Sequence, residues 1–311
     1  GFTPKLIDAL SFRRKQNLNI SFDETLQLIP YYSPHYPKKL KEIPDHPLIL
    51  YMRGEITCLE RSIAIVGTRN CTYYGKEVAF QLAEGLAAIG FTIISGLARG
   101  IDTAAHLGAL KRGRTAAVIG SGLAHIYPKE NEGLAKKIAE NGILLSEYSP
   151  TTPPHASNFP RRNRIVSGLS MGVVLIEAPE KSGAMLTMQN AHEQARPCFV
   201  IPGPVGNDFK GNHALIKTGK ALLVESAEEI ASHFDSLFSY SQTLIITPTF
   251  NFTWGEKEFY DKLPTEIICI DRIFSIVNLP VHQMQVMLMS LILKRALKEL
   301  PGKMYKKVVV N

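Results

Sequence analysis

The stretch SIAIVGTRNCTYYGKEVAFQLAEGLAAIGFTIISGLARG, residues 62–100, decides the fold. Two short β-branched runs, IAIV and TIIS, flank an amphipathic run over 76–89, and each apolar run ends in a glycine, Gly67 and Gly96. The order strand, helix, strand is typical of two parallel strands joined by a crossover helix. The segment therefore predicts one repeating unit of a parallel α/β sheet.

The same alternation continues outward to about residue 225. Further strand candidates are TAAVI, ILLS, VVLI, CFVI and ALLV, beginning at residues 115, 143, 173, 198 and 221, and a second helical run covers 134–141. These strands lack the polar and apolar alternation of a half-exposed sheet, so both of their faces are expected to be buried. The sequence predicts a doubly wound α/β fold with a mostly parallel sheet.

The regions on either side of this core have a different composition. Residues 1–55 contain several prolines and predict a small N-terminal element, helical over 3–18, and residues 56–235 form the main domain. Residues 236–252 carry no charged residue and predict a linker. Residues 253–311 contain three helical runs and a basic terminal hairpin, which indicates a winged helix with Asp271 capping its second helix.

Composition limits the class of protein. The chain has 311 residues, a formal charge of +7 and 45% apolar residues, which favours a globular protein with acidic partners such as nucleic acid. Its four cysteines lie far apart without metal-type spacing, so we expect reduced thiols, no metal and a cytoplasmic location. No apolar run is long enough to predict a membrane span.

The most cationic short segment is SNFPRRNR, residues 157–164. It carries three arginines and Phe159, and no Asp or Glu occurs between residues 148 and 176. Guanidinium groups match phosphate and an aromatic ring stacks on a base, so the segment indicates contact with an unpaired polynucleotide. The alternative is that these arginines pair with carboxylates, and Arg164 could equally turn inward to Glu147 or Glu177.

Glycines follow several of the predicted strands. They are Gly67, Gly96, Gly120, Gly122 and Gly203, and Arg69 and Arg99 belong to two of these turns. Because the carboxyl ends of parallel strands meet at one edge, glycine N–H groups and arginines there predict an anion site. Asp102 is expected to cap a helix, with His106 one turn later.

Eight ordered blocks of this sequence resemble the DNA-processing protein DprA/Smf family of bacteria. They include IAIVGTRNCTYYG, SGLARGIDTAAHLGAL, AAVIGSGLAHIYP, NFPRRNRIVSGLS, IEAPEKSGAMLT and FVIPGPVG, and the likeness is dense over residues 36–231. The resemblance implies a Rossmann-like domain without turnover chemistry or cofactor. It also implies that the protein binds and protects single-stranded DNA, helps to load a RecA-type recombinase during natural transformation, and forms a homodimer.

The resemblance also implies a DNA-binding site at the turns that follow the strands. Its residues would be Gly67, Thr68, Arg69, Ser95, Gly96, Arg99, Ser121, Gly122, Phe159, Arg161, Arg162, Asn163, Arg164, Lys181, Ser182 and Gly183. We expect the DNA backbone to lie over the glycine turns and a base to meet Phe159.

Two other classes of protein, a nucleotide-binding enzyme and a transcription regulator, share some of these sequence features. A phosphoribohydrolase-like enzyme that processes nucleotides would need a PGGxGT loop, where this chain has EKSGAMLT, and an NAD site would need the three-glycine spacing that GTRNCTYYG lacks. A transcription regulator would need base-reading side chains at the start of its third helix, where this chain offers only His282, Gln283 and Gln285. Both alternatives are disfavoured.

Overall fold

The computed structural model describes residues 26–55, 59–234, 252–277, 279–294, 296–300 and 302–308. The chain forms two compact units that divide between residues 241 and 242. The helix predicted over 3–18 and nearly all of the linker predicted over 236–252 lie outside the described residues.

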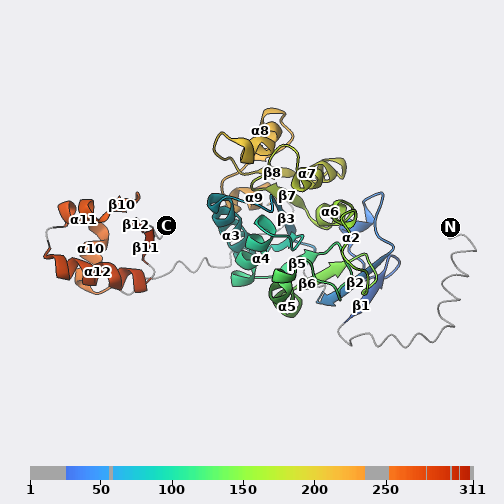
Figure 1. Cartoon of the computed structure of the whole chain (residues 1–311), viewed down its shortest axis with the longest axis horizontal. Helices are drawn as coiled ribbons and strands as arrows, with labels where there is room; N and C mark the ends of the chain where they lie inside the picture. The colour runs from blue at the N-terminus through green and yellow to red at the C-terminus, as the bar shows by residue number, and fades with distance from the viewer. Residues whose placement is uncertain are drawn as a thin grey trace, which may run out of the picture. The chain divides into compact units, whose positions relative to one another are not determined.

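The larger unit is built on a nine-stranded sheet, in the order β1-β2-β6-β5-β4-β3-β7-β8-β9 (Figure 1). The strands are β1 (Gln27–Pro30), β2 (Ile49–Gly54), β3 (Ser62–Val66), β4 (Thr92–Ser95), β5 (Thr115–Val118), β6 (Ile143–Ser146), β7 (Gly172–Leu175), β8 (Cys198–Val200) and β9 (Leu222–Leu223). The strands from β3 to β9 pair in parallel and coincide with the seven predicted runs. The predicted α/β fold with a mostly parallel sheet is confirmed.

Helices cover both faces of this sheet. They are α2 (Lys38–Lys41), α3 (Tyr73–Ala88), α4 (Ile101–Arg112), α5 (Glu132–Asn141), α6 (Asn158–Leu169), α7 (Gly183–Glu193), α8 (Lys210–Lys217) and α9 (Ala227–His233). Ile63 and Ile65 of β3 pack with α3, α4 and α9, whereas Ala64 and Val66 pack with α2, α6 and α7. Burial on both sides explains why the strand lacks polar positions.

The strand order reverses direction between β3 and β7. From β3 the chain first adds β4, β5 and β6 on one side and then β7, β8 and β9 on the other. In open α/β sheets a ligand crevice forms outside the carboxyl ends of the strands at such a switch point. The fold therefore places Gly67, which follows β3, beside the segment that follows β7.

Residues 26–55 belong to the same sheet. β2 pairs antiparallel with β6, and β1 pairs antiparallel with β2. We predicted a small N-terminal element over 1–55, whereas the described part of it extends the main sheet by two antiparallel strands, of which β1 lies at the edge. Prolines interrupt this stretch, so its short strands are hard to predict from the sequence.

The smaller unit contains α10 (Trp254–Lys262), β10 (Ile268–Cys269), α11 (Ile270–Ile276), α12 (Val281–Leu293), β11 (Leu297–Leu300) and β12 (Met304–Lys307). The three strands pair in the order β10-β12-β11 around a separate apolar core. Three helices and a terminal hairpin in this order match the predicted winged helix. Cys269, not Asp271, is the N-cap residue of α11.

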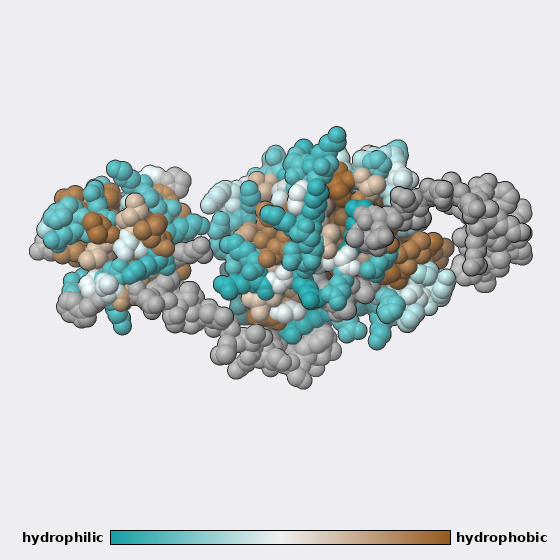
Figure 2. All heavy atoms as spheres, turned by 90° about the horizontal axis from the view of Figure 1, so that it is seen from below, coloured by the Kyte–Doolittle hydropathy of each residue, from teal (hydrophilic) through white to brown (hydrophobic). Residues whose placement is uncertain are grey.

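The surface of the smaller unit also carries apolar areas (Figure 2). Four large apolar side chains of α12, Val281, Val286, Met289 and Leu293, are exposed. Among the described residues no single helix is long and apolar enough to cross a membrane, and one bent pair, α11 with α12, reaches the required length and composition only jointly.

Candidate functional site

The main candidate site is a cavity at the switch point of the sheet. Its volume is about 730 Å³, and its walls come from the ends of β3 and β4, from α6 and from the start of α7. The charged residues that line it are Arg69, Asp102, Arg162 and Lys181. Three cations against one carboxylate make the cavity suitable for an anion.

Two loops at the floor are held against each other by their backbones. Gly100 has a φ of 73°, and a Cβ there would lie 2.5 Å from the carbonyl oxygen of Thr68. Only glycine combines this backbone conformation with so close an approach. Asn131 donates from its amide to the carbonyl oxygen of Leu97 at 2.9 Å, which fixes the second loop further. The turn that carries Arg69 is thereby positioned beside the loop that carries Arg99.

Arg162 forms the cationic floor of the cavity. Its side chain is only 4% exposed and donates to the carbonyl oxygens of Gly96 and Val118 and to Oδ1 of Asn163. Burial lowers the pKa of Arg162 to about 10, with a further contribution from Arg69. The guanidinium is still charged at neutral pH. It therefore places a fixed positive charge under any bound anion.

Asp102 was predicted to cap a helix, and this prediction is wrong. Gly100 is the N-cap residue of α4. The Asp102 carboxylate instead accepts hydrogen bonds from the N–H groups of Gly96 at 3.1 Å and Ala98 at 3.3 Å. Burial raises the pKa of Asp102, and the charge of Arg162 opposes this shift. The residue holds the loop after β4 in place.

Two of the glycine N–H groups predicted to face an anion already have partners inside the protein. The N–H of Gly96 donates to Asp102, and the N–H of Gly122 donates to the carbonyl oxygen of Thr152 at 2.8 Å. Buried N–H groups need such partners, so these donors are occupied inside the protein. The open donors come from α7, because Ser182 caps that helix and Gly183 and Ala184 at its start line the cavity.

Ten of the sixteen predicted site residues line the main cavity. They are Gly67, Thr68, Arg69, Gly96, Phe159, Arg162, Asn163, Lys181, Ser182 and Gly183. Arg99 lines only a smaller adjoining cavity of about 40 Å³. Phe159 is partly buried in the wall between them.

The other five predicted residues lie outside both cavities. Ser95 and Ser121 are buried and donate to the carbonyl oxygens of Ile65 and His125. Gly122 is packed against the backbone of residues 149 and 150, and Arg161 is exposed. The polar atoms of the two serines serve the protein itself, so the geometry gives them no role in ligand contact.

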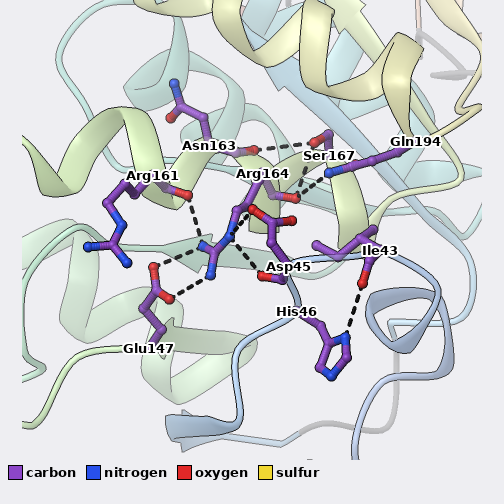
Figure 3. Close-up of polar contacts among 9 residues, drawn as sticks. All are labelled: Ile43, Asp45, His46, Glu147, Arg161, Asn163, Arg164, Ser167 and Gln194. Carbon is purple, nitrogen blue, oxygen red and sulfur yellow. Dashed lines mark hydrogen bonds and ion pairs between the residues drawn. The ribbon is translucent and has the colours of Figure 1, made fainter.

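Arg164 takes the inward alternative (Figure 3). Its guanidinium forms a two-pronged ion pair with Glu147, at 2.9 and 2.7 Å, and reaches the carboxylate of Asp45 at 2.8 Å. These contacts tie α6 to the loop before β2. Glu177, the other carboxylate considered as a partner for Arg164, instead accepts hydrogen bonds from the N–H and hydroxyl of Thr72.

Arg99 is exposed but already has an anionic partner. Its guanidinium forms a two-pronged ion pair with Glu130, at 2.9 and 2.8 Å, and both side chains are more than half exposed. The hydrogen bond to Glu130 raises the pKa of Arg99. Because the pair is solvated, a phosphate could compete with Glu130 for the guanidinium.

The sequence reasoning missed Tyr127 as a cavity residue. It lines both cavities, and its ring centroid lies 5.4 Å from that of Phe159. The signal was present, because Tyr127 follows the glycine turn after β5 and belongs to the quoted block AAVIGSGLAHIYP.

The described residues contain no group of three or more His, Cys, Asp or Glu arranged to hold a metal. Cys71, Cys198 and Cys269 are free thiols.

The fold and the cavity together define a doubly wound α/β protein with a cationic pocket at the switch point of its sheet. The chain belongs to the DNA recombination-mediator protein A family, whose model matches residues 27–235. The family resemblance inferred from the sequence motifs is thereby confirmed.

Two relatives show how far the similarity extends. The DNA processing protein DprA of Bacillus subtilis is 43% identical over 232 residues, which cover 74% of this chain and 75% of that protein. The protein Smf of Escherichia coli is 46% identical over 207 residues, which cover 65% of this chain and 55% of that protein.

Two solved structures share the fold. DNA processing protein A from Streptococcus pneumoniae superposes with a TM-score of 0.65 at 38% identity, over 72% of this chain and 77% of that one. A DNA processing protein A from Helicobacter pylori, described for its single-stranded DNA binding mode, superposes with a TM-score of 0.63 at 31% identity. This superposition covers 68% of this chain and 97% of the H. pylori chain.

Proposed function

We propose that this protein binds single-stranded DNA without sequence preference in the cavity at the switch point. The observation that carries the proposal is the convergence of Arg69, Arg162 and Lys181 with the start of α7 on one cavity. Side-chain cations and open helix N–H groups are the donors that phosphate prefers. The H. pylori relative, described for single-stranded DNA binding, supports the choice of ligand.

An unpaired strand suits this cavity better than a duplex. A duplex presents its bases edge-on in grooves and its phosphates on a convex surface, whereas a single strand can turn both phosphate and base into a pocket. The cavity offers cations and two aromatic rings, Tyr127 and Phe159. Backbone charge and stacking are common to every nucleotide, so little sequence preference is expected.

Membership of the family supports the wider role. We propose that the protein protects single-stranded DNA and helps to load a RecA-type recombinase during natural transformation, acting as a cytoplasmic homodimer. Binding rather than catalysis is proposed, because Asp102, the carboxylate in the cavity, already accepts two backbone hydrogen bonds. A regulator of transcription is disfavoured, because the start of α12, where base-reading side chains would be needed, offers only His282, Gln283 and Gln285 beside the exposed apolar Val281.

Titration of labelled oligo-dT at several salt concentrations tests this proposal. If the three cavity cations each neutralise one phosphate, log affinity should fall with log salt with a slope of about −2, at about −0.7 per phosphate. The double variant Arg69→Ala/Lys181→Ala should reduce the slope to about −0.7. The matched control Arg112→Ala/Lys137→Ala removes the same charges outside the cavity and should change the slope much less. A tight preference for duplex, or equal slopes for both double variants, would contradict the proposal.

A further inference from the structure

We infer that an apolar stripe on α12 is a self-association surface, which packs against the same stripe of a second copy of this chain. Three of the four exposed apolar side chains of the helix form the stripe, namely Val286, Met289 and Leu293. The stripe belongs to the smaller unit and shares no residue with the cavity. The contact is therefore independent of the proposed DNA binding.

The three side chains of the stripe follow one line along the helix. Their spacing, at positions i, i+3 and i+7, places them on one face of α12. Val286, Met289 and Leu293 are 66%, 60% and 76% exposed. Single apolar residues on a surface need no explanation, whereas three in one line form a patch that a partner can cover.

The orientation of α12 is fixed, so the stripe cannot turn into the core. The opposite face of the helix fills the apolar core of the smaller unit with Met284, Leu288 and Leu291. On another side, the buried carboxylate of Glu256 accepts hydrogen bonds from the hydroxyl of Ser290 and, at 2.6 Å, from Nζ of Lys294. α12 is thus held by its core contacts and by α10, and the stripe faces outward.

The lack of charge on α12 favours a second copy as the partner. Residues 281–293 contain no Asp, Glu, Lys or Arg. DNA phosphates would need cations on the helix, and helices that lie on membranes carry Lys or Arg beside their apolar face. Two copies of a charged surface repel each other across a two-fold axis, whereas a neutral apolar stripe is complementary to its own copy.

The size of the stripe limits the strength of the contact. Complete burial of one Val, Leu or Met side chain removes about 60–120 Å² of apolar surface from water, so three that are two-thirds exposed offer on the order of 200 Å² per copy. A stable interface buries about 800 Å² per partner. We therefore expect a weak association, in the high micromolar range, that acts between copies already held close together.

The position of Met289 provides a specific test of self-association. Val286 and Met289 lie near the middle of the stripe, so in a two-fold pair of antiparallel helices they lie close to the axis. A charge placed at Met289 would then face the same charge on the second copy. Opposite charges on the two copies would attract each other instead.

Sedimentation equilibrium of the full chain, from low to high micromolar concentration, measures the association. The mass of the unmodified chain should rise with concentration. Met289→Glu alone and Met289→Lys alone should each weaken the association by about tenfold or more, and an equimolar mixture of the two should restore it. The matched control Thr265→Glu adds the same charge at an exposed position of the smaller unit outside the stripe and should leave the association unchanged. A dimer formed through any other surface persists in all variants, so the readout is the rise above that mass.

Recovery on mixing is the decisive result, because two misfolded variants could not restore each other. The self-association surface is refuted if the unmodified chain shows no rise in mass, if Met289→Glu associates as strongly as the unmodified chain, or if the mixture does not recover. Binding to phosphatidylglycerol vesicles that both Met289 variants lose, without any self-association, would refute it as well and assign the stripe to a membrane surface.

Discussion

We expect Glu130 to compete with DNA for Arg99, so replacing Glu130 should strengthen the proposed DNA binding. The two side chains form a two-pronged ion pair at 2.9 and 2.8 Å, and they are 58% and 53% exposed. Solvated pairs of this kind are weak, so DNA has little to displace. Glu130→Gln removes the competing charge and leaves Arg99 able to contact a phosphate. We expect the salt slope to become steeper by about 0.7 and the affinity at moderate salt to rise by no more than about fivefold.

Titration of oligo-dT across salt concentrations measures both quantities. The matched control is Glu84→Gln, which removes the same charge from another ion pair outside both cavities, in which the partner Arg112 is exposed and Glu84 is half-buried. The control separates the freeing of Arg99 from the general rise in positive charge. If Glu130→Gln and Glu84→Gln raise the affinity and the slope equally, Arg99 does not contact the strand and the reasoning is refuted.

Two further predictions concern stability. Arg164→Met should lower the free energy of unfolding by about 3 kcal/mol in urea denaturation, because it leaves the largely buried carboxylate of Glu147 without its partner, while the salt slope of DNA binding stays unchanged. If the slope of log affinity against log salt became shallower in this variant, Arg164 would be a DNA contact after all. Burial lowers the pKa of His106 to about 3 from an ordinary 6.5, so between these pH values the unfolded chain binds a proton that the folded chain does not. The free energy of unfolding should therefore fall as the pH drops below 6.5, by up to about 1.4 kcal/mol per pH unit. His106→Asn, which can keep a hydrogen bond to Thr115, should show a shallower loss between about pH 5 and 7, and identical pH profiles would argue against the buried neutral histidine.

Much of the fold could be predicted because each parallel strand is a short continuous apolar run. Ile63 and Ala64 lie next to each other in one strand and enter different cores, so both had to be apolar. The antiparallel strands β1 and β2 were not predicted. β1 lies at the edge of the sheet, where a strand tolerates a proline such as Pro30, and β2 mixes apolar residues with Arg53 and Gly54. Tyr127 was missed for a related reason, since a single aromatic in a loop carries no periodic signal.

The sequence by itself determined the class of the fold, the family, and the gathering of glycines and arginines at the carboxyl ends of the strands, because these depend on local runs and on the rule that parallel strands end at one edge. Only the tertiary structure decided what each arginine of RRNR does. These residues lie in α6, where successive side chains point about 100° apart. Arg162 therefore reaches the cavity, Arg161 is exposed to solvent and Arg164 meets Glu147. Whether a side chain of α6 meets a carboxylate depends on segments that are distant in the sequence, so no local pattern predicts it.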